Sequence, residues 1–127
     1  MPMFEKHFTV DEANALIPHI LSVFETVQSL RAELEESKDA LEQVHQAVPG
    51  NGGSTQGREL VERSEAIGRL LAGLDEQGII VKDPDTGLID FPHIREDREV
   101  FLCWRIGEKT VGHWHDLDSG FRGRQPL

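Results

Sequence analysis

Residues 9–48 read TVDEANALIPHILSVFETVQSLRAELEESKDALEQVHQAV, and this stretch decides the fold of the 127-residue chain. One set of mostly apolar residues recurs every seven positions and a second set fills the complementary register. The two sets are Ala13, Ile20, Val27, Leu34, Leu41 and Val48, then Leu16, Val23, Leu30, Ser37 and Val44. Such a heptad seam is typical of a helix that packs along a partner helix. Thr9 and Glu12 have the spacing of a capping box, which predicts where the helix begins.

Pro18 lies two turns inside this predicted helix. Proline removes one backbone hydrogen bond at that point. The sequence therefore predicts either one long helix kinked near Pro18 or two helices, the second with Pro18 in its first turn. A single helix over 9–48 would be roughly 55 Å long. One small core does not cover that length, so we expect a partner along it.

A second helix is predicted over 58–77, after a flexible glycine-rich loop at 49–57. Its apolar pattern alternates by four and three through Leu60, Ser64, Ile67, Leu71 and Leu74. Gly78 is the expected C-cap glycine. Together the helices predict a long antiparallel, coiled-coil-like hairpin. Because the second helix is about half as long as the first, part of the first must pack on the remaining domain, on another subunit, or on both.

The period of the sequence changes after Gly78. GIIVKD and LIDFP flank a PDTG turn, REVFLCWRIG is rich in β-branched and aromatic residues, and TVGHWHD follows. Residues 78–127 are thus expected to form a β meander of three to four antiparallel strands and a C-terminal tail. In the third strand the face with Val100, Leu102, Trp104 and Ile106 should be core. The prediction is a single α+β domain over 1–127, in which the helical hairpin packs with a small sheet.

Composition excludes several classes of function. The formal net charge of −10 disfavours a partner that is nucleic acid or an anionic membrane. The single cysteine, Cys103, allows no internal disulfide, so a reducing compartment is expected. No stretch approaches the ~20 apolar residues of a membrane span, and the N-terminus lacks a signal-peptide run. We expect a cytoplasmic protein.

Four blocks of the chain carry a resemblance to a known family. They are HFTVDEANALIPHI (7–20), GIIVKDPDTGLIDFP (78–92), REVFLCWRIGE (98–108) and WHDLDSGFRGRQPL (114–127). In that order they resemble an uncharacterised prokaryotic family, domain-of-unknown-function family 2203, over the whole chain. The resemblance implies a compact bacterial or archaeal cytoplasmic protein. It implies no activity, substrate or catalytic residue.

The strongest candidate site is a metal site at His113 and His115. Residues two apart in a strand point to the same face, so both imidazoles should project together. Asp116 or Asp118 would complete the ligand set, or a residue on a neighbouring strand would do so; those residues are Asp90, His93 and Cys103. Imidazole and carboxylate ligands suit zinc, iron, nickel or manganese. The alternative is a polar strand face whose histidines bind backbone groups or carboxylates.

Three further motifs have a functional and a structural interpretation. Asp116 and Asp118 have the first spacings of a calcium loop, but Gly120 falls one residue early and the closing glutamate is missing. Arg122 and Arg124 suit a phosphate-bearing ligand, although pairing with the acidic helices or a second subunit is favoured. Cys103 is interpreted as a buried, unreactive thiol, since a nucleophile would need a neighbouring base such as His113 or His115.

Three functions follow, in this order. The first is a self-associating interaction or scaffold protein, a homodimer through the long helix. The second is a metal-binding protein or metal-dependent enzyme centred on His113 and His115. The third is a binder of small anions through Arg122 and Arg124. Whether the chain is an enzyme stays open at this point.

Overall fold

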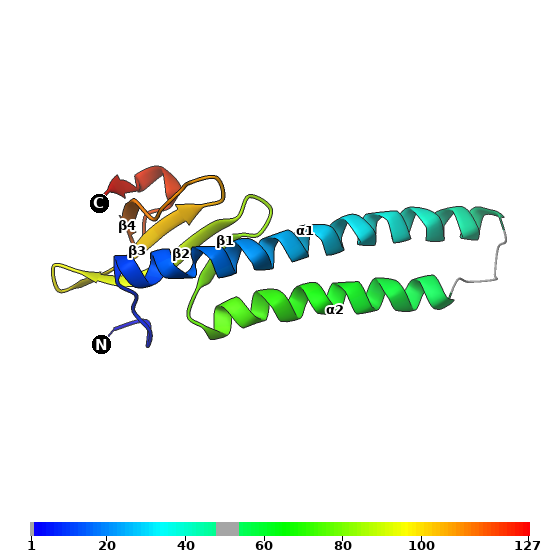
Figure 1. Ribbon diagram of the computed structural model, residues 1–127, viewed down its shortest axis with the longest axis horizontal. Coiled ribbons are helices and arrows are strands. Elements are labelled where there is room, and N and C mark those ends of the chain that lie inside the picture. Colours follow the sequence, from blue (N-terminus) through cyan, green and yellow to red (C-terminus); the bar gives the residue numbers. More distant parts are fainter. Residues whose placement is uncertain (1, 48–53) are drawn as a thin grey trace. The chain divides into compact units, whose positions relative to one another are not determined.

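The structure, a computed structural model, describes the backbone of residues 2–47 and 54–127 and the side chains of residues 2–40 and 57–127. Two helices precede a five-stranded sheet (Figure 1), which confirms the α+β class. The elements are α1 (Val10–Ala47), α2 (Ser54–Glu76), β1 (Ile80–Asp83), β2 (Leu88–Arg95), β3 (Arg98–Arg105), β4 (His113–Asp116), the 3-10 turn η1 (Phe121–Gly123) and β5 (Gln125–Pro126). They fall into two compact units, residues 1–22 with 73–127 and residues 23–72.

The start of α1 confirms the predicted capping box. The Glu12 amide donates to Thr9 Oγ1 at 3.0 Å, and the Thr9 amide donates to Glu12 Oε1 at 2.9 Å. The helix continues through Pro18, so the alternative of two separate helices is wrong. No helix among the described residues is apolar over the length needed to cross a membrane.

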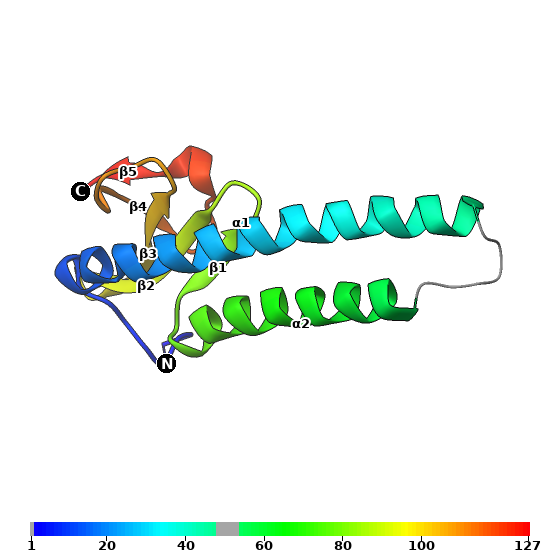
Figure 2. The same cartoon turned by 45° about the vertical axis from the view of Figure 1, so that its right-hand side comes forward.

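The second helix begins earlier than predicted. α2 starts at Ser54, so residues 54–57 are helical although the sequence assigned them to the loop. The rest of the predicted loop, 49–53, lies outside the described residues, as do the side chains of Leu41 and Val44 and all of Val48. Within the second unit, Figures 1 and 2 both show α1 and α2 running side by side. Arg63 of α2 joins them through Glu33 at 3.1 Å and Ser37 at 3.3 Å.

The buried face of α1 differs from the predicted heptad seam. Among its described side chains, the buried apolar ones are Ala13, Ile17, Ile20, Val23, Phe24 and Val27. Ile17 and Phe24 lie outside the seam, while Leu30 and Leu34 within it are only half-buried. The first turns of α1 lie on the sheet, where the Val111 amide donates to Asn14 Oδ1 at 2.7 Å. A helix that packs on a sheet uses a broader apolar face than a coiled-coil seam, which accounts for Ile17.

The sheet is an antiparallel meander in the order β1-β2-β3-β4-β5. It has one strand more than the three to four predicted, because the tail returns and pairs Gln125 with Trp114. Of the predicted core face, Val100, Leu102 and Trp104 are buried, whereas Ile106 lies beyond the end of β3 and is half-buried. The opposite face of β3 is also buried, since Phe4 covers Phe101 at 5.4 Å between ring centroids and the tail covers Cys103.

Glu99 holds the N-terminal segment against the end of the sheet. Its carboxylate accepts hydrogen bonds from the Met3 amide at 2.7 Å, the Phe4 amide at 3.0 Å and His7 Nε2 at 2.8 Å. These donors, the Met3 amide foremost, lower the pKa of Glu99 to about 2. The interactions therefore stabilise the attached segment fully above the ordinary carboxyl pKa of 4.5, and this stabilisation is lost as the pH falls toward 2.

We expect acid to release this segment. The amide resonances of Met3 and Phe4 should shift together as the pH is lowered from 5 toward 2, because protonation of Glu99 removes their acceptor. In Glu99→Gln the segment should already be released at pH 7, with no such transition. Glu96→Gln, three residues earlier in the turn between β2 and β3 and exposed, is the control. Unchanged amide shifts in Glu99→Gln at pH 7 would disprove the role of Glu99.

Candidate functional site

Three side chains that could each bind a metal ion lie together on one face of the sheet: Asp90 of β2, Cys103 of β3 and His115 of β4. Asp90 pairs with Cys103 across the two strands, and His115 pairs with Phe101, two residues from Cys103. Because side chains alternate along a strand, all three point to the same face. Each is buried, and their ligand atoms lie within 4.8 Å of one another. No other such group of three occurs among the described residues.

The hydrogen bonds of His115 fix the orientation of its ring and require a hydrogen on Nδ1. Nδ1 lies 2.8 Å from the Asp116 carbonyl oxygen. A carbonyl only accepts, so Nδ1 must carry a hydrogen. Nε2 lies 3.1 Å from both carboxylate oxygens of Asp90. Nε2 is thus directed at the carboxylate, and a proton on either group would be shared between Nε2 and Asp90.

Burial controls the electrostatics of this site. It raises the pKa of Asp90 above its ordinary value, although His115 and then Lys82 oppose the rise. It also raises the pKa of the Cys103 thiol to about 11, with the charge of Asp90 as the second cause. Arg124, 3.9 Å from the sulfur, acts in the other direction. At neutral pH the thiol is protonated, which agrees with the interpretation of Cys103 as unreactive.

A small cavity lies beside Asp90 and His115. Its volume is about 130 Å³, and its other lining residues are Lys82, Leu88, Ser119, Gly120 and Phe121. The Lys82 amine is 4.0 Å from Asp90 Oδ2 and 4.9 Å from the centroid of the Phe101 ring. The cavity thus combines a buried acid–imidazole pair, one cation and apolar walls.

The structure does not bring the four predicted metal ligands together. Only His115 of that set lies in the buried group. His113 Nδ1 is 3.7 Å from Glu108 Oε2. Asp116 follows His115 directly and so points to the opposite face, where Arg98 binds it at 2.8 Å. Asp118 is exposed in the turn after β4.

Of the three residues proposed on neighbouring strands, Asp90 and Cys103 reach His115 and His93 does not. His93 Nδ1 lies 2.7 Å from the Phe8 carbonyl oxygen, on the opposite face of the sheet. Lys82 and the cavity were not predicted from the sequence. The signal for Lys82 was its position in β1, the one cation within the apolar run GIIVKD.

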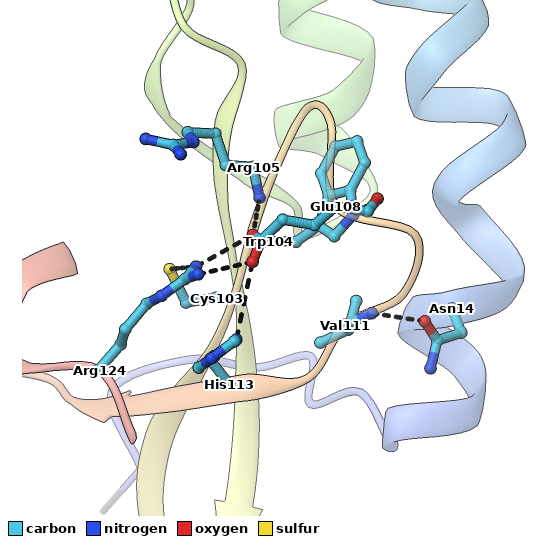
Figure 3. Close-up of polar contacts among 8 residues, drawn as sticks. All are labelled: Asn14, Cys103, Trp104, Arg105, Glu108, Val111, His113 and Arg124. Carbon is cyan, nitrogen blue, oxygen red and sulfur yellow. Dashed lines mark hydrogen bonds and ion pairs between the residues drawn. The ribbon is translucent and has the colours of Figure 1, made fainter. Parts of the chain in front are cut away.

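The tail is fastened by Arg124 (Figure 3). Its guanidinium donates to both oxygens of Glu108, at 3.0 and 2.6 Å. This pairing raises the pKa of Arg124 and lowers that of Glu108. Glu108 also accepts from the Arg105 amide at 2.8 Å. The pairing is intramolecular as favoured, but its carboxylate comes from the β3–β4 loop and not from an acidic helix, because β5 lies beside β4.

Arg122, the second arginine of the anion site predicted from the sequence, has different surroundings from Arg124. It is exposed in η1, whereas Arg124 is half-buried and stacks on Phe121 at 4.4 Å. The two arginines therefore do not share the same contacts.

Comparison with known proteins places the chain in a family but adds no chemistry. A family model described as "Uncharacterized conserved protein (DUF2203)" matches residues 6–127. No curated protein and no solved structure matches the chain.

Proposed function

The chain belongs to the DUF2203 family, and we propose that it binds a divalent transition metal ion of the zinc type through Asp90, Cys103 and His115. The observation that carries the proposal is the orientation of His115. Its Nδ1 hydrogen is held by the Asp116 carbonyl, and its Nε2 is directed into the group of possible ligands. Metal-binding histidines commonly have such a second hydrogen bond, which fixes the tautomer and orients the ring.

The spacing of the ligand atoms supports this proposal. Bond lengths of about 2.0 Å for nitrogen and oxygen and 2.3 Å for sulfur place tetrahedral zinc ligands roughly 3.3–3.6 Å apart. Nε2 and the Asp90 oxygens are already 3.1 Å apart. The Cys103 sulfur, within 4.8 Å of both, needs to move by about 1 Å, a change that side-chain rotation supplies. The metal would take the place of a proton shared between Nε2 and Asp90.

The kinds of ligand select the metal and its role. A thiolate with an imidazole favours zinc or another late transition metal over magnesium or calcium. Three protein ligands leave a fourth position free, as in catalytic zinc sites. The neighbouring cavity supports a water molecule or a small ligand at that position. A metal there would act as a Lewis acid, so the proposal includes a metal-dependent enzyme.

Elemental analysis of protein purified without an affinity tag tests the proposal. We expect close to one equivalent of zinc after supplementation and dialysis. His115→Gln and Cys103→Ala should bind less than a tenth of that, while His113→Gln should bind as much as the native chain. A native protein without bound metal would refute the proposal. Equal loss in His113→Gln would instead favour the ligand set predicted from sequence.

Self-association through the helices is a second candidate, supported by the second unit. There the buried apolar residues among those described are Val23, Phe24 and Val27. The other apolar seam residues of this unit whose side chains are described are half-buried; they are Leu30 and Leu34 of α1 and Leu60, Ile67 and Leu71 of α2. We propose that these residues form a coiled-coil-like hairpin that a second copy covers, which would add the missing burial.

Light scattering tests the dimer directly. At micromolar concentration the native chain should have twice the mass of one chain. Leu34→Asp should be monomeric because a buried, unpaired charge opposes association. Ala32→Asp, exposed on the same helix, should remain a dimer. A native chain with the mass of a monomer would exclude this candidate.

Binding of a phosphate-bearing ligand through Arg122 and Arg124 is not proposed, since the Arg124 guanidinium is already paired with Glu108.

A further inference from the structure

We infer that the metal-loaded site takes a small oxyanion of the carboxylate or bicarbonate type, held in the cavity beside Asp90 and His115 with Lys82 as its charge partner. The inference rests on the proposed metal site. It adds the class of ligand that occupies the free coordination position. Charge, position and size each support it.

The charges of the metal-loaded site leave Lys82 unbalanced. In the metal-free site its amine lies 4.0 Å from Asp90 Oδ2, a carboxylate that is almost fully buried. A divalent metal would be neutralised by two negative ligands, the Asp90 carboxylate and the Cys103 thiolate. Arg124 is already paired with Glu108. The positive charge of Lys82 then remains at the cavity, and a low-dielectric surrounding strengthens its attraction for an anion.

Lys82 is also placed to reach a ligand. It belongs to the edge strand β1 and lines the same cavity as Asp90 and His115. Its side chain is 44% exposed and its amine lies over the Phe101 ring. The half-exposed Lys82 and the buried metal ligands thus line the same cavity, and a bound anion would lie between the Lys82 amine and the metal.

The size of the cavity limits the ligand. A volume of about 130 Å³ has room for a few water molecules or one small ligand. Acetate and bicarbonate, with four non-hydrogen atoms each, match that space. Nucleotides and peptides do not. Leu88 and Phe121 give the cavity apolar walls beside the charged groups.

Cobalt-substituted protein tests the inference, because the visible spectrum of Co²⁺ responds to a new ligand. Acetate and bicarbonate are titrated at constant ionic strength, and each should give a saturable spectral change. Lys82→Gln should lower the affinity for the anion at least about tenfold, the loss expected for one short ion pair. Lys82→Arg should retain most of the affinity. Lys109→Gln, an exposed lysine in the loop before β4, should match the native protein.

The outcomes separate the two proposals. Failure to take up Co²⁺ overturns the proposed function and this inference with it. Uptake of Co²⁺ without a saturable response to either anion overturns the inference alone, as does equal anion affinity in Lys82→Gln and the native protein. Loss of affinity in Lys82→Gln together with retention in Lys82→Arg supports it.

Discussion

Excess Zn²⁺ is expected to raise the free energy of unfolding of the metal-free protein by about 4 kcal/mol when its concentration is ~1,000 times the dissociation constant. The gain arises because Asp90, Cys103 and His115 come together only in the folded sheet. The unfolded chain has no such group and binds the ion weakly. Denaturant unfolding with and without Zn²⁺ measures the difference.

Variants assign this gain to the site. His115→Gln, Cys103→Ala and Asp90→Asn should each lose it, whereas Asp118→Asn and His113→Gln should keep it. The gain should also shrink as the pH falls, because the metal must displace the proton of a thiol whose pKa is about 11. Equal stabilisation of native protein and His115→Gln would show that Zn²⁺ binds elsewhere.

Removal of the Arg124 guanidinium is expected to cost about 2 kcal/mol of stability. Arg124→Ala leaves the Glu108 carboxylate, whose side chain is only 22% exposed, without its bidentate partner. The loss should appear as a lower denaturant midpoint. It should also speed hydrogen exchange of the Leu127 amide, which bonds the Gly112 carbonyl at 3.0 Å in the tail–β4 pairing.

Arg122→Ala is the matched control for the tail. Arg122 is exposed and lies two residues from Arg124, so its removal should change stability by less than about 0.5 kcal/mol. Similar losses in the two variants would show that the Arg124–Glu108 pair does not fasten the tail. Because Ser119, Gly120 and Phe121 line the cavity, a detached tail should also weaken metal binding.

The sequence named all three members of the candidate site among its possible ligands, but it did not single them out from His113, Asp116, Asp118 and His93. His115 was predicted, and Asp90 and Cys103 were identified as possible neighbours because a meander places β2, β3 and β4 side by side. Their actual meeting depends on register: moving β4 by one residue would turn His115 to the other face. Composition and hydrophobic pattern do not determine that register to one residue.

The prediction of Asp116 as a ligand beside His115 was wrong, and the sequence already contained the reason. It follows His115 directly in an extended strand, so the two side chains must point to opposite faces. The predicted ligand set combined residues from both faces. The structure places Asp116 with Arg98 instead. Lys82 and Glu108 were missed for a different reason: Lys82 lies where the register of β1 shifts between Val81 and Asp83, and Glu108 reaches Arg124 from an irregular loop.

The apolar pattern of α1 was misread because a single helix can pack on different partners along its length. The heptad seam from Ala13 to Leu34 is real in the sequence, yet Ile17 and Phe24 are buried as well. A stripe with a period of 3.6 residues overlaps a heptad over the first few turns and diverges slowly from it. Both patterns were therefore present in the same stretch.

Titration of the metal-free protein with Co²⁺ tests the central claim most directly, because a cysteine thiolate bound to Co²⁺ gives an intense charge-transfer absorption that other ligands do not give. The native chain should develop this absorption and reach its end point at one equivalent. Cys103→Ala should bind without it or not bind, and His113→Gln should match the native chain. A native protein that gives no thiolate absorption at any Co²⁺ concentration would contradict a metal site built from Asp90, Cys103 and His115.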